Sequence, residues 1–195
     1  MQLITESSYD LELYEDSKDK SLKIVGIFSS AEIENNNKRK YKRPILEREV
    51  KKIQEKISNR CLFGELSHPS NPEINPERIS HIIESLEWKN NDVYGKAKIL
   101  PTPSGSIAKT LIKEGNIGIS SRGLGTVNED GYVNEDYNLI TYDIVLDASN
   151  PGSKFVNGIL EGTNFGPEPV PTIEEAKEVY KRHIWQVIAQ IEKGM

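Results

Sequence analysis

The chain of 195 residues is long enough to form one domain with its own hydrophobic core. Hydrophobic residues make up 36% and charged residues 28%, which is typical of globular proteins and excludes a membrane-embedded or largely disordered chain. The formal net charge of −5 argues against a general nucleic-acid binder, because phosphate affinity requires clustered cations. We therefore expect neither a membrane nor a nucleic acid as a direct partner.

Two further features indicate the compartment. The N-terminal sequence MQLITESSYD lacks the basic region and apolar stretch of a signal peptide, so we expect an intracellular protein. The single cysteine, Cys61, cannot form an internal disulfide, which fits a reducing compartment. Cys61 lies in the apolar run RCLFGEL, so we expect a small buried side chain there rather than a thiol nucleophile.

In the first half of the chain, local patterns predict two strands, a basic loop and two helices. In chain order they are a strand opening the segment 22–33, the loop NNNKRKYKRP at 35–44, a helix over 44–57, a short strand in RCLFGEL at 60–66 and a helix over 75–88. The last of these has Asn75 as a cap and Pro76 in its first turn, and His81 within it is expected to pack or to face solvent. The basic loop is expected to be solvated rather than bound to nucleic acid or an acidic partner.

In the second half, alternating and β-branched runs predict three strands, over 92–100, 117–127 and 139–149. A helix over 106–114 and a turn at Asp130-Gly131 connect them. A capping box from Thr172 to Glu175 predicts a C-terminal helix over 172–195, and the Pro-rich GPEPVP before it is typical of a linker. We therefore expect a main domain over 1–166 and a linker with a helical tail over 167–195. The interspersed elements predict an α+β fold: a mixed or antiparallel sheet, or a small barrel, surrounded by helices.

The side chains that a serine hydrolase needs occur in the predicted strands and turns. Such an enzyme requires a nucleophile, a base, a group that orients the base, and donors for the oxyanion. His68 is a candidate base because it ends the short strand in the turn GELSHP, where a ring can face a cleft. Ser120 and Ser121 lie in ISSRGLG, whose glycines let backbone N–H groups approach a substrate closely.

Charged residues near these positions complete the candidate set. Asp143 stands in the otherwise apolar strand TYDIV, where a carboxylate is costly unless it is paired, so it is a candidate to orient the histidine. Asp147 shares its strand face by alternation and is a second candidate. Arg122 and Gly123 are candidates to stabilise the oxyanion.

Four motifs together resemble one protein family. GELSHP, EWKNNDVYGKAKIL, IGISSRGLGT and YDIVLDASNPGS, in this order and at these intervals, are similar to the prohead maturation proteases of tailed phages, especially the T-even type. The resemblance covers residues 62–153, and upstream only the general layout agrees. It implies the fold of the herpesvirus assemblins, a closed antiparallel barrel ringed by helices, and a serine protease activity. One departure is Ala148, where related sequences often have proline; it affects a turn rather than the chemistry.

The resemblance implies roles for individual residues. His68 corresponds to the general base, Ser120 to the nucleophile and Asp143 to the acid that orients the histidine. More distant relatives carry Ser-x-Gly, which would select Ser121, so both serines stay open, as do Asp143 and Asp147 for the acid. The implied mechanism uses no cofactor and no metal.

The resemblance also implies substrates and a location. Family members cleave scaffold or core proteins and the major capsid protein inside the prohead, in the host cytoplasm, and they process themselves. They cut after glutamate with Ile or Leu two residues earlier, a preference that residues 4–6 (ITE) before Ser7 and residues 13–15 (LYE) before Asp16 both fit. A glutamate-accepting pocket is expected to use Arg122 or the cations of the basic loop between Lys38 and Arg43. The C-terminal helix is then either a removable tail or a plain stabilising helix, and both of these, like a homo-oligomer, are left open.

Two other classes of function fit parts of the sequence. An inactive structural or scaffold protein of the phage head would share the fold, because these proteases are thought to be related to tail-tube proteins. The joint presence of a histidine, a serine and an aspartate in the right motifs argues against it. A metal-dependent hydrolase would use Glu65 and His68 as ligands, but GELSHP is predicted as strand and turn, and no second histidine lies close in sequence.

Overall fold

The computed structural model describes residues 2–7, 11–17, 19–35, 37–69, 71–114, 117–146 and 160–161. The chain divides into two compact units, Met1–Thr163 and Asn164–Met195, and all described residues belong to the first. The expected linker, the C-terminal helix and Asp147 lie outside the described residues. No helix in the described part of the chain is long and apolar enough to cross a membrane.

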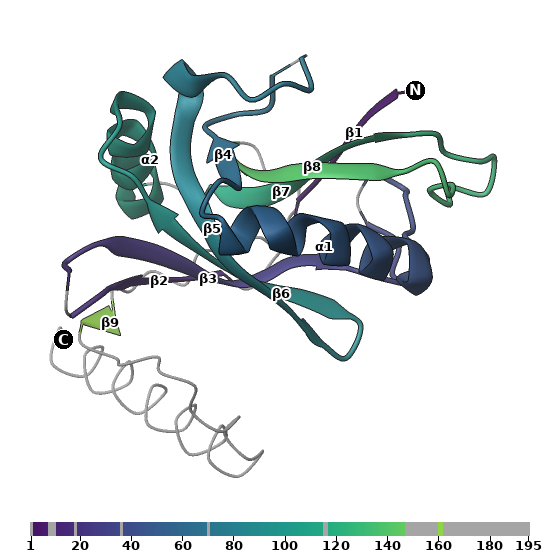
Figure 1. Ribbon diagram of the computed structural model, residues 1–195, viewed down its shortest axis with the longest axis horizontal. Helices are drawn as coiled ribbons and strands as arrows, with labels where there is room; N and C mark the ends of the chain where they lie inside the picture. Colours follow the sequence, from purple (N-terminus) through teal and green to yellow (C-terminus); the bar gives the residue numbers. More distant parts are fainter. Residues whose placement is uncertain are drawn as a thin grey trace, which may run out of the picture. The chain divides into compact units, whose positions relative to one another are not determined.

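The described strands form two sheets (Figure 1). The three-stranded sheet is antiparallel, with the order β1 (Gln2–Ser7), β7 (Gly118–Gly125), β8 (Asn138–Val145). The six-stranded sheet has the order β4 (Phe63–Glu65), β5 (Ile79–Lys89), β6 (Asp92–Ile99), β3 (Leu22–Ser30), β2 (Leu11–Glu15), β9 (Leu160–Glu161). Only the β2–β9 pair among these is parallel. The α+β prediction is confirmed, whereas β1, β2 and β9 were not expected from local patterns.

The two sheets meet along the core without closing into the barrel that the resemblance implied. An isolated bridge between Leu66 and Ile144 links the end of β4 to β8. Phe28 of β3 and Tyr142 of β8 also join the two sheets, because their rings pack with centroids 5.3 Å apart. The core therefore fills the space between the sheets, and the described strands keep an open arrangement.

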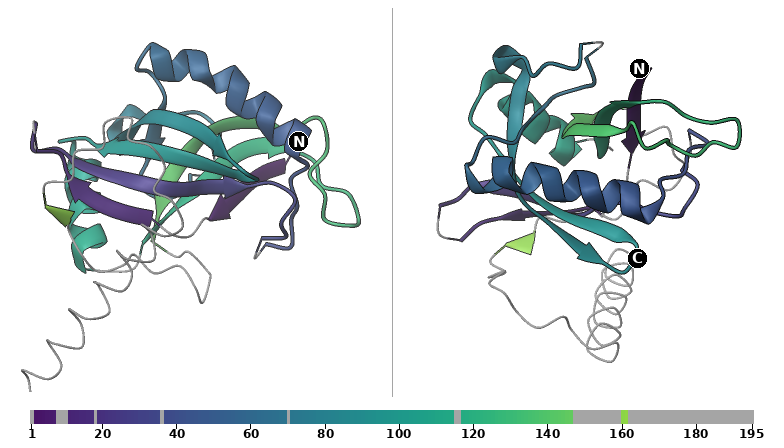
Figure 2. Two further views of the ribbon diagram at one scale, coloured as in Figure 1. Left: turned by 90° about the horizontal axis from the view of Figure 1, so that it is seen from below. Right: turned by 45° about the vertical axis from the view of Figure 1, so that its right-hand side comes forward.

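Helix α1 (Arg43–Ser58) covers β5 and β8, as the views of Figure 2 show. Pro44 stands in its first turn, and Leu46, Val50 and Ile53 recur at helical spacing on the buried face. Burying each such side chain contributes about 1.5–3 kcal/mol. Helix α2 (Pro103–Glu114) packs against β5 and β6. The predictions of both helices are confirmed, α2 beginning a few residues earlier than expected.

The predicted helix over 75–88 is wrong. Asn75 does cap a turn, since its Oδ1 accepts the Glu77 N–H at 3.0 Å, but only a 3₁₀ turn (Pro76–Arg78) follows. The chain then continues as β5, a central strand paired with β4 and β6. Because α1 and α2 both pack against β5, its apolar residues occur on both faces and show no period of two. That pattern cannot be distinguished from a buried helix by periodicity alone.

One smaller expectation is wrong, and the basic loop gains a structural description. Cys61 is exposed rather than buried, in the link between α1 and β4. In the basic loop, Lys38 and Lys40 form ion pairs with Glu34, each at 3.3 Å, and Lys40 also lies over the Tyr132 ring. The loop is thereby held against the turn that joins β7 to β8.

Candidate active site

The turn after β4 places His68 at the end of the three-stranded sheet. Leu66 bridges to Ile144, and the Ser67 N–H donates to the Ile144 carbonyl at 2.6 Å. Ser67 has a positive φ of 69°, a left-handed conformation that costs a non-glycine residue about 1–2 kcal/mol. Arg78 holds the same turn, because its Nη2 lies 3.3 Å from the Leu66 carbonyl. The chain direction reverses here, and the His68 side chain stays 20% exposed.

Strands β7 and β8 bring a serine and an aspartate to this histidine. Ser120 and Asp143 are cross-strand partners, so their side chains share one face of the sheet. The His68 ring joins them: its Nε2 lies 2.7 Å from Ser120 Oγ and its Nδ1 lies 2.9 Å from Asp143 Oδ2. Ser121 is paired with Tyr142 and by alternation faces the other side. The structure thus groups three of the candidate side chains and separates Ser121 from them.

Asp143 is a fully buried carboxylate with several donors. Its Oδ1 accepts the Glu65 backbone N–H at 2.9 Å and Arg122 Nη2 at 3.2 Å. Its Oδ2 lies 2.8 Å from Arg122 Nε and faces the His68 ring. A carboxylate only accepts, so His68 Nδ1 must carry the hydrogen, and Nε2 is left as an acceptor for the Ser120 hydroxyl.

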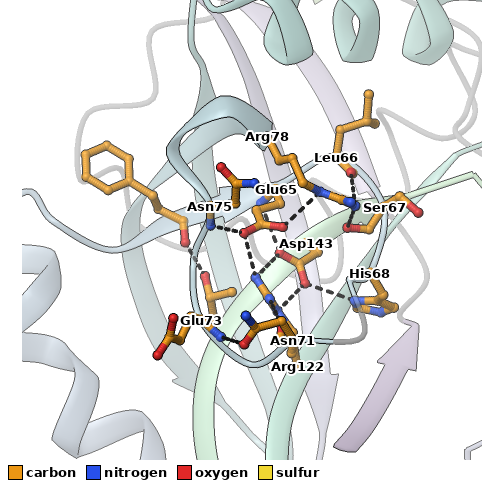
Figure 3. A network of polar contacts seen from close by, with 12 residues as sticks. Glu65, Leu66, Ser67, His68, Asn71, Glu73, Asn75, Arg78, Arg122 and Asp143 are labelled. Atoms are coloured by element: carbon orange, nitrogen blue, oxygen red, sulfur yellow. Dashed lines mark hydrogen bonds and ion pairs between the residues drawn. The ribbon is translucent and has the colours of Figure 1, made fainter.

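A network of charges lies behind Asp143 (Figure 3), and it is buried except for the Arg78 side chain, which is 40% exposed. Arg122 is fully buried, with Nη2 3.6 Å from Glu65 Oε1 and Nη1 donating to the Asn71 carbonyl at 3.0 Å. Glu65 is also fully buried and faces Arg78 Nε at 3.3 Å. Two carboxylates and two guanidinium groups therefore balance to zero charge. Removing one member of such a cluster leaves a buried charge unpaired, at a cost of about 3–5 kcal/mol.

The contacts of Arg122 and Gly123 give no support to their predicted oxyanion role, which stays a prediction. The Arg122 guanidinium is engaged with Asp143, Glu65 and a backbone carbonyl, and is fully enclosed. Gly123 lies three residues beyond Ser120, roughly 10 Å along the strand. A side chain at Gly123 would approach the Tyr137 ring to within 2.4 Å, so this glycine makes room for an aromatic ring.

A second histidine sits beside the network but is sealed from solvent. His81 is fully buried, with Nδ1 2.9 Å from Ser80 Oγ and Nε2 3.0 Å from the Tyr142 carbonyl. Burial lowers the pKa of His81 to about 4, although the Asp143 charge acts in the opposite direction. Gly64 is required here, because a Cβ at that position would lie 2.3 Å from the His81 ring.

A metal site at Glu65 and His68 does not match these contacts, since Glu65 is paired with arginines and His68 with Ser120 and Asp143. Within the described residues, no group of three or more His, Cys, Asp or Glu side chains is arranged to hold a metal ion. Sequence analysis missed Glu65 and Arg78 as members of the network. The available signal was the same as for Asp143: Glu65 is a carboxylate in an otherwise apolar run.

Three comparisons with known proteins give matches. A family model described as prohead core protein serine protease matches residues 4–163. The prohead core protein protease of Enterobacteria phage T4 is 42% identical over 149 residues, which covers 70% of each chain. The solved structure of the bacteriophage T4 capsid assembly protease matches with a TM-score of 0.67 and 34% identity, over 74% of this chain and 96% of that one.

Proposed function

Because this chain belongs to the family of prohead core protein serine proteases, we propose that it is a serine endopeptidase with Ser120 as nucleophile, His68 as general base and Asp143 as the orienting acid. Its substrates are the core or scaffold proteins and the capsid protein of a phage prohead, and it acts inside that prohead in the host cell. The observation that carries the proposal is the chain of two short contacts, 2.7 Å from Ser120 Oγ to His68 and 2.9 Å from His68 to Asp143.

The mechanism follows from the hydrogen positions. Ser120 Oγ attacks the scissile carbonyl carbon while His68 Nε2 accepts its proton. Asp143 keeps the other ring nitrogen protonated and stabilises the imidazolium that forms. The imidazolium then donates its proton to the leaving amine, and water hydrolyses the acyl-enzyme by the same route. Arg122 acts through Asp143: its fork holds the carboxylate in the orientation that His68 requires.

The proposed specificity is cleavage after glutamate with Ile or Leu two residues earlier, including self-processing. The basic loop is a poor candidate for the glutamate pocket, because Lys40 pairs with Tyr132 at the far end of the β7–β8 hairpin from Ser120. Arg122 is equally poor, because its guanidinium is already neutralised and enclosed.

Covalent labelling tests the proposal. A biotinylated fluorophosphonate is expected to modify the protein at Ser120, located by mass spectrometry of the labelled peptide. Ser120→Ala is expected to abolish the label and the cleavage of a peptide containing Ile-Thr-Glu-Ser. Ser121→Ala is the matched control and is expected to retain both. An unlabelled protein without peptidase activity would instead support an inactive structural role. A label on Ser121 would identify Ser121 rather than Ser120 as the nucleophile.

A further inference from the structure

The first strand of the chain lies beside the strand that carries the candidate nucleophile. β1 is the outer strand of the three-stranded sheet and pairs antiparallel with β7 (Figure 1). In this register Ser7 lies opposite Ser120, and Glu6 lies opposite Ser121. The Glu6–Ser7 peptide bond is therefore held level with the nucleophile and one strand spacing away, roughly 5 Å.

The same bond is one of two that fit the proposed specificity, which is cleavage after glutamate with Ile or Leu two residues earlier. The other, after residues 13–15, lies in β2, between β3 and β9 in the six-stranded sheet. Leu13 and Tyr14 are buried there, at 5% and 3% exposure, so an active site could not receive this segment unless β2 left its sheet. The strand register is observed independently of the proposed cleavage preference, and the two together select the Glu6–Ser7 bond.

The edge of β7 under β1 has the properties of a peptide-binding edge. A strand at the edge of a sheet directs alternate backbone N–H and C=O groups outward, and an extended peptide satisfies them by adding as a further strand. The opposite edge of β7 is taken by β8. An external peptide can therefore pair with β7 only on the side that β1 now occupies.

We propose that the β1-facing edge of β7 is the substrate-binding site for extended peptides, with the glutamate before the scissile bond opposite Ser121, and that β1 is the first substrate of the chain. This inference rests on the proposed function, because it requires Ser120 to cleave peptide bonds. While the Glu6–Ser7 bond is intact, residues 2–7 occupy the edge and exclude other peptides.

Processing of β1 follows the ordinary serine protease steps. Ser120 Oγ bonds to the Glu6 carbonyl carbon, the Glu6–Ser7 C–N bond breaks, and the Ser7 amine leaves with the proton that His68 had taken from Ser120. Water then hydrolyses the ester, which gives a Glu6 carboxylate and restores the Ser120 hydroxyl. One water is consumed for each bond cut, and no other reactant is needed.

Cleavage changes how strongly β1 competes for the site. A tethered segment competes at an effective concentration on the order of millimolar, whereas the released peptide of residues 1–6 is diluted into solution. The edge of β7 is then free for substrates supplied in trans. Residues 2–7 thus act as the inhibitory segment of a zymogen.

The first test measures peptide binding without catalysis, comparing full-length Ser120→Ala with Ser120→Ala lacking residues 2–6. The probe is a fluorescein-labelled peptide with the sequence of residues 3–8, followed by anisotropy, and a scrambled peptide of the same composition is the control. We expect the shortened chain to bind the probe at least about tenfold more tightly, because the tethered competitor is absent. Equal affinities of the two chains, or equal binding of the scrambled peptide, overturn the inference.

This test separates the inference from the proposed function. If the protein is labelled at Ser120 and cleaves peptides, but its affinity for the probe does not depend on residues 2–6, the proposed function is supported and the inference about β1 is overturned. If the affinity difference is found but the protein never cleaves a peptide, the peptide-binding edge is supported and the proposed protease function is overturned.

The second test follows the full-length active chain by intact-mass spectrometry, so it does not depend on the folding of a shortened protein. We expect loss of residues 1–6 with a rate constant that stays unchanged over an about 100-fold dilution, because β1 lies on its own β7. Glu6→Gln is expected to retain residues 1–6. Its matched control is Glu15→Gln, the same change in the motif on β2, which is expected to trim like the unaltered chain. A rate proportional to protein concentration, or slowed trimming of Glu15→Gln with normal trimming of Glu6→Gln, overturns the proposal.

Discussion

Two serine–histidine pairs lie next to each other along β8, and they have opposite surroundings. His68 contacts Ser120 and the Asp143 carboxylate and is partly open to solvent. His81 contacts Ser80 and a backbone carbonyl and is fully buried. In both pairs one ring nitrogen faces an acceptor, so the other nitrogen accepts the serine O–H.

The comparison teaches that a hydrogen bond from serine to histidine does not by itself make a catalytic pair. A general base must hold a proton for part of the cycle, and burial lowers the pKa of His81 to about 4, which disfavours its charged form. It must also reach a substrate, which the enclosed ring cannot do. His68 has a carboxylate partner and a side chain that is 20% exposed, and these two differences favour His68 over His81 as the proposed general base.

The largest expected effect tests which pair is catalytic. Ser120→Ala and His68→Ala are each expected to lower kcat/KM for a peptide substrate by about 10⁴-fold or more, because the nucleophile or its base is lost. Ser80→Ala is the control from the second pair; it is expected to cost about 1–2 kcal/mol of stability and to leave activity within about threefold. Fluorogenic peptide assays and thermal melts measure both. The comparison breaks if Ser80→Ala is folded and as inactive as Ser120→Ala.

The next effect concerns the carboxylate that only one pair possesses. Asp143→Asn is expected to reduce kcat by about 10³–10⁴-fold, because the amide no longer stabilises the imidazolium and permits the wrong tautomer. The rate of fluorophosphonate labelling should fall in parallel. Asp19→Asn, an exposed aspartate that pairs with Lys98, is the matched control and should keep full activity. Normal labelling by folded Asp143→Asn would contradict the assigned role.

A smaller effect is expected from the residue behind the carboxylate. Arg122→Lys keeps the charge but loses the fork that contacts both Asp143 oxygens, and it is expected to lower kcat about 100-fold with little change in KM. A double-mutant cycle with Asp143→Asn tests the route of this effect. In the Asp143→Asn background, Arg122→Lys should lower kcat little further. A full and independent loss there would indicate direct contact with the substrate.

The smallest effect on activity is expected at the buried pair of Ser80 and His81. The same pair is expected to make the stability of the protein depend on pH. The pKa of His81 lies near 4 in the folded chain against 6.5 for an ordinary histidine, so between these pH values the unfolded state binds more protons. The free energy of unfolding is therefore unaffected by His81 above about pH 6.5. It falls as the pH decreases below that value, and at pH 5 it is lower by about 2 kcal/mol. Urea unfolding of Ser120→Ala at pH 7 and pH 5 measures this loss.

The control for that measurement removes the titrating ring. Ser120→Ala carrying His81→Gln should lose this share of the pH dependence while keeping a polar group near Ser80. An identical pH dependence in the two proteins would show that other groups account for it. At pH 7, His81→Gln in the active chain is expected to change kcat very little if the protein remains folded.

Local sequence patterns predicted α1, α2, β3, β6, β7 and β8. The apolar residues of these elements either recur at the spacing of a helix or strand with one buried face, or form the continuous run of a buried strand. They failed at residues 75–88, where apolar residues on both faces of β5 imitate a helix. They also missed β1, whose partner β7 lies more than a hundred residues away in the sequence, because pairing depends on which sheet edge is left unpaired.

The sequence by itself determined His68 as the candidate base, and it limited the candidate nucleophile to Ser120 or Ser121 and the candidate acid to Asp143 or Asp147, because the motifs around them resemble those of one family. The tertiary structure alone decided that Arg122 lies behind Asp143 rather than over a substrate. It alone also decided that the Glu6–Ser7 bond lies beside Ser120. The physical reason is that contacts between distant segments depend on strand register and total burial, which local periodicity does not record.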